Sequence, residues 1–92
     1  MSLTKVEKEY TKAFDEWAEV NKEVVLLKTR LEAIRYTLRR VNIDGVEFDA
    51  FRELIAKLQD DIYTAENLLS KKEELLQIAI NNLRKSEVSR GI

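Results

Sequence analysis

Apolar residues recur along the chain at alternating intervals of three and four residues. The first series has no polar member and comprises Leu3, Val6, Tyr10, Ala13, Trp17, Val20, Val24, Leu27, Leu31, Ile34, Leu38 and Val41. The second series comprises Phe48, Phe51, Ile55, Leu58, Ile62, Ala65, Leu69, Lys72, Leu76, Ala79, Leu83 and Ser86. Sustained spacing of this kind is typical of coiled coils. It predicts two long α-helices, over about residues 5–41 and 45–86.

The predicted helix ends carry matching signals. The stretches "TKVE" at 4–7 and "DGVE" at 44–47 both have the spacing of a capping box at a helix start. Arg39 and Arg40 suit the negative end of the first helix dipole. We therefore expect a turn at 42–44 and a frayed tail at 87–92.

So short a link between long helices forces them to run antiparallel. The sequence predicts an all-α fold, an antiparallel two-helix coiled-coil hairpin that forms a single domain over residues 1–92. One alternative has three helices, because "SKKE" at 70–73 is a further possible capping box. A continuous second helix is favoured, since the apolar series passes through this stretch without a glycine or proline.

Folding the chain at Gly45 fixes which residues face each other. The two apolar series, which together we call the seam, then pair from Val41 opposite Phe48 near the turn toward Val6 opposite Leu83. Lys72 falls opposite Trp17, and we expect its stem to lie along the indole in a cation–π contact. The same register makes neighbours of Arg30 and Asp61, and of Lys28 and Glu66.

More apolar side chains are present than one seam uses. On one flank they are Leu26, Ala33, Leu54, Leu68, Leu75 and Ile78, and on the opposite flank Phe14, Ala18, Val25 and Ile80. An apolar stripe wider than a coiled-coil seam belongs to a helix with more than one neighbour. The simplest neighbour is a second copy, which predicts a homodimer in the form of a four-helix bundle.

Composition narrows the class of protein. The formal net charge is only −1, so the overall charge does not imply a strongly charged partner. There is no proline and glycine occurs only twice, which favours a helical protein over a turn-rich β architecture. No apolar run is long enough for a signal peptide or a membrane span, so we expect a cytoplasmic protein without a membrane segment.

The sequence lacks the residue types that most catalytic sites use. Histidine and cysteine are absent, and the adjacent carboxylates at 60–61 and 73–74 point about 100° apart on a helix. A calcium loop centred on Gly45 would need acids where Arg40 and Phe51 stand. We therefore predict no catalytic residues, no cofactor and no metal site, and a protein that is not an enzyme.

The main functional hypothesis is a structural or adaptor protein that acts through helix–helix association with itself. An alternative is a small chaperone, of the secretion or phage-assembly type, that binds a helix of a different protein. A second alternative is nucleic-acid binding through an arginine-rich tip formed by Arg35, Arg39, Arg40 and Arg52. The acidic stretch 44–66 argues against it, because folding lays those carboxylates beside the arginines.

Overall fold

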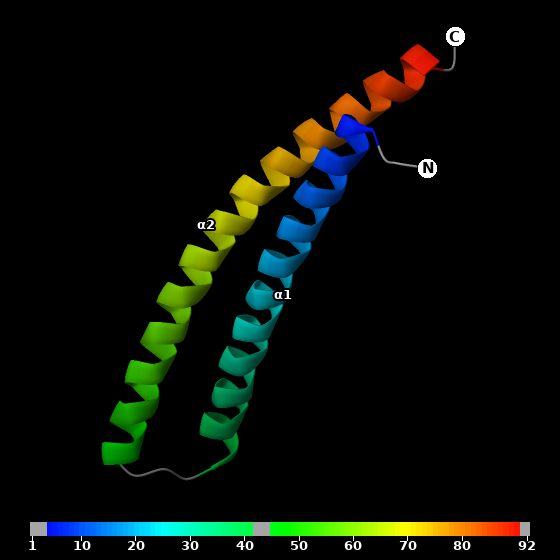
Figure 1. Cartoon of the computed structure of the whole chain (residues 1–92). Helices are drawn as coiled ribbons and strands as arrows, with labels where there is room; N and C mark the ends of the chain where they lie inside the picture. Colours follow the sequence, from blue (N-terminus) through cyan, green and yellow to red (C-terminus); the bar gives the residue numbers. More distant parts are fainter. Residues whose placement is uncertain (1–3, 42–44, 91–92) are drawn as a thin grey trace.

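The computed structural model describes residues 4–41 and 45–90, without the side chains of residues 46, 89 and 90. Helix α1 spans Lys5–Arg40 and helix α2 spans Gly45–Arg90. The two helices run antiparallel and lie against each other along their length (Figure 1). The predicted all-α helical hairpin is confirmed.

Helix α1 begins where the capping box places it. Thr4 has an extended backbone, and its hydroxyl oxygen accepts a bond of 3.2 Å from the amide of Glu7. The same hydroxyl donates to the Glu7 carboxylate at 2.9 Å. One side chain thus satisfies an amide that has no partner inside the helix and also holds the carboxylate near the positive end of the helix dipole.

Helix α1 ends one residue before the predicted position. Val41 has φ −107° and ψ 134°, and so it leaves the helical period even though its amide still donates to Thr37. Val41 and Phe48 are 53% and 45% exposed, so the predicted pairing of these residues does not close the seam at the turn. The predicted turn at 42–44, with its capping residue Asp44, lies outside the described residues.

Helix α2 is one continuous helix of 46 residues. It has no break at Ser70, so the three-helix alternative is wrong. The predicted frayed tail is also wrong over residues 87–90, which are helical. No glycine or proline follows Gly45 until Gly91, so nothing in the sequence interrupts the backbone hydrogen bonds before that point.

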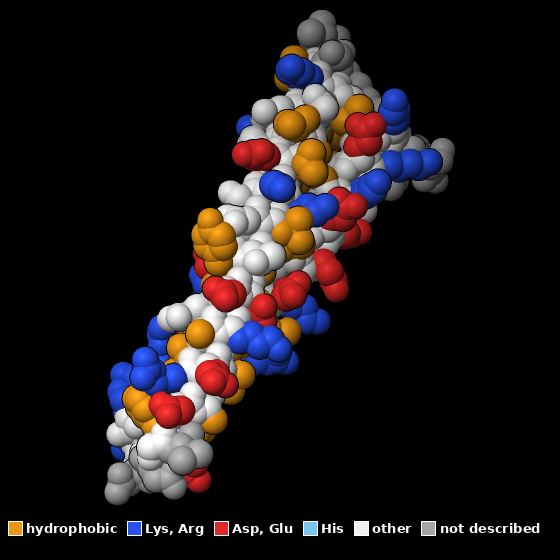
Figure 2. All heavy atoms as spheres, turned by 90° about the vertical axis from the view of Figure 1, so that its left-hand side faces the viewer, with side chains coloured by type: hydrophobic (Ala, Val, Ile, Leu, Met, Phe, Trp, Pro, Cys, Tyr) orange, Lys and Arg blue, Asp and Glu red, His pale blue; other side chains and the backbone are white. Residues whose placement is uncertain are grey.

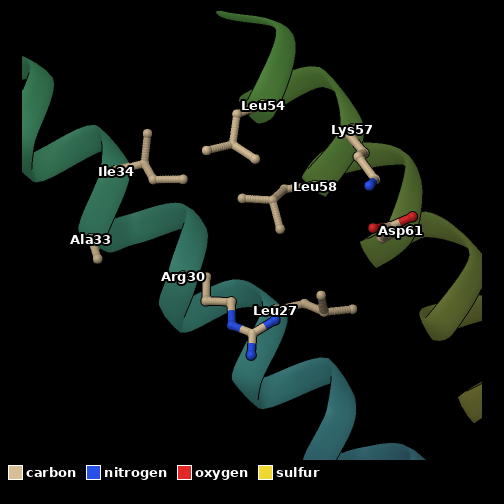
Figure 3. A pocket seen from close by; sticks show the side chains of 8 residues that line it. All are labelled: Leu27, Arg30, Ala33, Ile34, Leu54, Lys57, Leu58 and Asp61. Atoms are coloured by element: carbon tan, nitrogen blue, oxygen red, sulfur yellow. The ribbon is translucent and has the colours of Figure 1, made fainter. Parts of the chain in front are cut away.

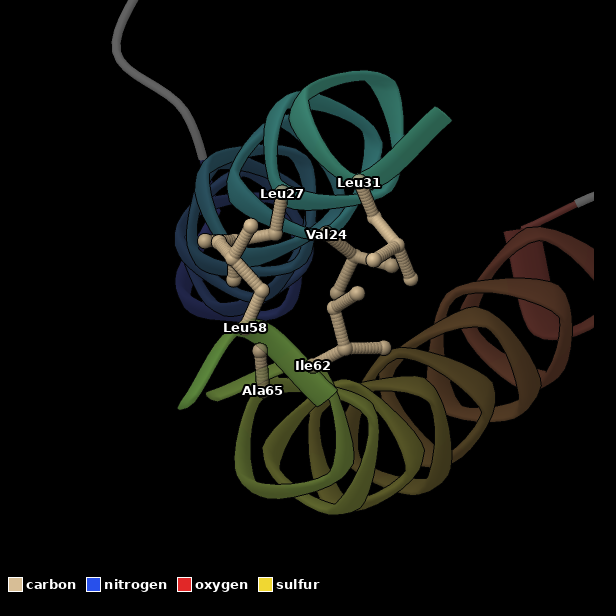
Figure 4. Close-up of a cluster of buried hydrophobic side chains, with 6 residues drawn as sticks. All are labelled: Val24, Leu27, Leu31, Leu58, Ile62 and Ala65. Carbon is tan, nitrogen blue, oxygen red and sulfur yellow. The ribbon is translucent and has the colours of Figure 1, made fainter. Parts of the chain in front are cut away.

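The core lies along the predicted seam. All buried residues of the described chain belong to the two apolar series: Val20, Val24, Leu27, Leu31, Leu58, Ile62, Ala65 and Ala79. Figure 4 shows three residues of α1, Val24, Leu27 and Leu31, directed at Leu58, Ile62 and Ala65 of α2. These are the partners that the register predicts.

The molecule is a rod with principal extents of 69 × 19 × 19 Å. Its radius of gyration is 20.3 Å, whereas a compact chain of this length has a radius of about 12 Å. Helix α2 is the longer helix and its last turns extend past the start of α1 (Figure 1). Almost every residue is therefore close to the surface, and function must reside on the faces of the rod.

Candidate interaction surface

One face of the rod gathers the predicted interface residues of the first flank. We call it the groove face and define it by Leu26, Ala33, Leu54, Leu68, Leu75 and Ile78. The five large side chains are between 43% and 55% exposed, and Ala33 is exposed as well. The structure thus leaves all six of these residues free to meet another molecule.

Helical spacing explains why these residues share a face. Leu26 and Ala33 are seven residues apart, as are Leu68 and Leu75, and Leu54 precedes Leu68 by fourteen. In a coiled coil of 3.5 residues per turn, positions separated by sevens return to the same side of the helix. In Figure 2 separate apolar side chains lie along the rod among charged side chains of both signs.

A groove lies on this face toward the turn. This tip groove has a volume of about 440 Å³. Figure 3 shows Ile34, Leu54 and Leu58 directed into the space between the helices, with charged residues around them. Ala33 is the smallest of the residues that line the groove. Its lining is Leu27, Arg30, Ala33, Ile34, Leu54, Lys57, Leu58 and Asp61.

A shallower groove lies on the same face toward the free ends of the helices. This open-end groove has a volume of about 230 Å³, and Leu75 and Ile78 form one side of it. The side formed by α1 is charged, with Glu9, Lys12 and Glu16. Leu26 and Leu68 lie between the two grooves, one heptad from Ala33 and Leu75 respectively.

The opposite flank is less available. Phe14 and Val25 are 43% and 54% exposed, but Ala18 and Ile80 are partly buried. The Phe14 ring also contacts two other aromatic rings, with centroid distances of 6.3 Å to Tyr10 and 5.9 Å to Trp17. Part of this flank is thus already used inside the chain, and the groove face is the better candidate.

Charged pairs across the seam agree with the predicted register. The Lys28 ammonium lies 3.7 Å from the Glu66 carboxylate, as predicted. Arg30 and Asp61 both line the tip groove, on opposite helices. Together with Lys57 they surround an apolar floor with charges. The register predicted the Arg30–Asp61 neighbours but not the groove, because a register fixes levels along the helices and not the space between them.

The contact predicted for Lys72 is wrong. The Lys72 ammonium lies 3.4 Å from the Glu16 carboxylate, and the two cation–π contacts of the described residues lie elsewhere. An anion one residue from Trp17 attracts the ammonium more strongly than the indole ring does. The register could have identified Glu16, since Lys72 falls at the level of residues 16 and 17.

The arginines of the predicted tip contact their own chain. Arg35 pairs with Glu32 at 3.3 Å, and Arg39 donates to the backbone oxygen of Arg35 at 3.3 Å. Arg40 lies 5.1 Å from the ring of Tyr36, and Arg52 lies 6.0 Å from the ring of Phe48. Each guanidinium thus has a contact within its own helix, and the structure adds no support to the nucleic-acid alternative.

The described residues contain no candidate metal site. No group of three or more carboxylates among them is placed to hold a metal ion, and no buried polar side-chain atom among them lacks a partner. Neither described helix has an apolar stretch long enough to cross a membrane.

Comparisons with known proteins suggest no function for the chain. No protein-family model, no curated protein and no solved structure matches the chain.

Proposed function

We propose that this chain is a non-enzymatic structural or adaptor protein that acts by helix–helix association through the groove face, with a second copy of itself as partner. The observation that carries the proposal is the row of half-exposed leucine and isoleucine side chains along one face. An apolar stripe of this kind on a helical hairpin becomes buried when other helices pack against it.

The exposed area supports the need for a partner. The hairpin exposes 7346 Å² of surface. A compact monomer of 10.8 kDa exposes about 5,500 Å². The excess of about 1,800 Å² is more than the roughly 800 Å² that each partner buries in a standard protein interface. A dimer that covers one face would bring the exposed area per chain closer to that of an ordinary folded protein.

The groove face also suits association energetically. Full burial of a leucine or isoleucine side chain contributes about 1.5–3 kcal/mol, and these side chains are roughly half-buried already, so each adds about 1 kcal/mol on contact. Five such side chains offset a substantial part of the entropy lost on association. The charges between them remain at the edges, where they favour one partner over another.

The test is the mass of the purified protein by sedimentation equilibrium. We expect a dimer, and we expect the double variant Leu68→Asp with Leu75→Asp to be a helical monomer, because buried carboxylates oppose contact at both positions. Val25→Asp is the matched control: Val25 is 54% exposed but lies on the opposite flank, so this variant should remain a dimer.

Two other outcomes would contradict the proposal. If the double variant stays dimeric and Val25→Asp dissociates, the interface is on the opposite flank. If the unmodified protein is a monomer at all concentrations, self-association is wrong. In that case the alternative of a chaperone that holds a helix of a different protein in the tip groove takes its place.

A further inference from the structure

We infer that the two copies meet through their groove faces in opposite orientations, so that the turn of each hairpin lies over the open end of the other. This inference rests on the proposed self-association and adds the geometry of the partner. It follows from the order of side chains on the groove face, from the two grooves, and from the positions of the charges.

The apolar residues of the groove face have nearly the same order from either end. The register places Leu54 beside Ala33 near the turn, and Leu75 lies beside Ile78 near the open end. Toward the middle of the rod, Leu26 lies one heptad from Ala33, and Leu68 lies one heptad from Leu75. One heptad is about 10 Å along a helix. A two-fold axis perpendicular to the rod, at a level between Leu26 and Leu68, brings Leu54 of one copy to the level of Leu75 and Ile78 of the other.

The two ends of the face also fit each other in shape. The tip groove is a hollow of about 440 Å³, whereas Leu75 and Ile78 project at 50% and 55% exposure. In the opposite orientation, α2 faces α2 of the second copy, and these two side chains reach its tip groove. The symmetry repeats the contact, so each copy both fills a groove and has its own filled.

Charges on the groove face match in the same arrangement. Arg30 of one copy lies at the level of Glu16 of the other, and Asp61 lies at the level of Lys71. Asp61 and Lys71 are ten residues apart on α2, about 15 Å, and so they do not pair within one chain. The opposite orientation gives each of them a partner of opposite sign.

The same-direction arrangement fits less well. With both turns at one end, α2 of one copy faces α1 of the other. Leu75 and Ile78 would then lie over Lys12 and Glu16, the charged side of the open-end groove. Burying those charges against apolar side chains costs free energy. The structure therefore favours the opposite orientation.

Cysteine cross-linking tests the orientation directly, since the chain has no cysteine of its own. Leu54→Cys and Leu75→Cys are made as separate single variants. On one helix these positions are 21 residues apart, about 31 Å, far beyond the reach of a disulfide. We expect a mixture of the two variants to form a disulfide-linked dimer on mild oxidation, and each variant alone to remain largely unlinked.

A second mixture reports the competing arrangement. Ala33→Cys mixed with Leu54→Cys links between copies only if the two turns lie at the same end, and such a product would overturn the inference. If sedimentation shows a dimer but neither mixture links, the orientation is wrong and the proposed self-association stands. If sedimentation shows only monomer, the proposed function fails first.

Charge exchange provides an independent readout. Asp61→Lys and Lys71→Asp should each weaken dimerisation about five-fold or more, since each change occurs at two symmetry-related contacts. The double variant should recover most of that loss because it restores both pairs with their signs reversed. A double variant weaker than either single variant would contradict the pairing.

Discussion

Lys72 shows how one residue adapts to a position that its neighbours define. It is the only charged residue in either apolar series, and it occupies a seam position with its side chain 25% exposed. Its stem packs where a leucine would, and its ammonium reaches Glu16 at the edge. The ion pair is partly solvated and so contributes only about 0.2–1 kcal/mol. Its larger effect is to oppose registers that would bury the ammonium without a carboxylate.

Replacing Lys72 with leucine should therefore stabilise the hairpin. Burial of a leucine side chain at this seam position contributes more than the partly exposed ion pair does, and we expect the free energy of unfolding to rise by about 1 kcal/mol. The melting temperature measured by circular dichroism checks this, with Lys22→Leu as the control, because Lys22 is exposed and outside the seam. A lower melting temperature for Lys72→Leu would mean that the Glu16 pair holds the helices together.

At the scale of the helix, neighbouring residues have different roles. Leu27 is 9% exposed in the seam, whereas Leu26 is 48% exposed on the groove face. A rotation of about 100° between successive residues separates the side that holds the hairpin together from the side that meets a partner. Helix α1 therefore presents two apolar surfaces from one continuous sequence.

Alanine at these two positions should give effects of different kinds. Leu27→Ala removes a buried side chain and should lower the free energy of unfolding by about 2–4 kcal/mol at every protein concentration. Leu26→Ala should have little effect on a dilute monomer and should instead weaken the dimer. Urea unfolding at two protein concentrations distinguishes the variants. Equal losses that do not depend on concentration would place Leu26 in the core of the single chain.

The whole molecule is a rod with a core only one seam thick. Six of its buried side chains form a single cluster near the middle, and Val41 and Phe48 near the turn remain exposed. A thin core of this kind contributes limited free energy against the entropy of ordering the chain. Association through a second face would add burial without lengthening the chain.

The melting temperature should then depend on protein concentration. If unfolding is coupled to dissociation of a dimer, mass action raises the melting temperature as the protein is concentrated. Melting curves over about a hundred-fold range of concentration measure this, and the variant with Leu68→Asp and Leu75→Asp should show no such dependence. If the melting temperature of the unmodified protein does not change with concentration, its unfolding is not coupled to dissociation of a dimer.

Much of this fold could be predicted from the sequence, because coiled-coil packing is a repeating local pattern. The apolar series located the buried residues, and the spacing at Thr4 and Glu7 located the start of α1. The end of α2 was misjudged because the apolar series stops at Ser86, while a helix continues as long as its backbone bonds are uninterrupted. The Lys72 contact was misjudged because two possible partners lie within reach of one flexible side chain.

The sequence alone determined the antiparallel pairing and its register, since a period of three and four residues allows one close-packed face for each helix and a short link allows one direction. Only the tertiary structure decided the depth and position of the grooves, because these depend on the distance between the helices and on how far the side chains of both helices project. Periodicity defines a face by angle alone. A surface that another molecule can occupy also requires the distances between side chains from two helices.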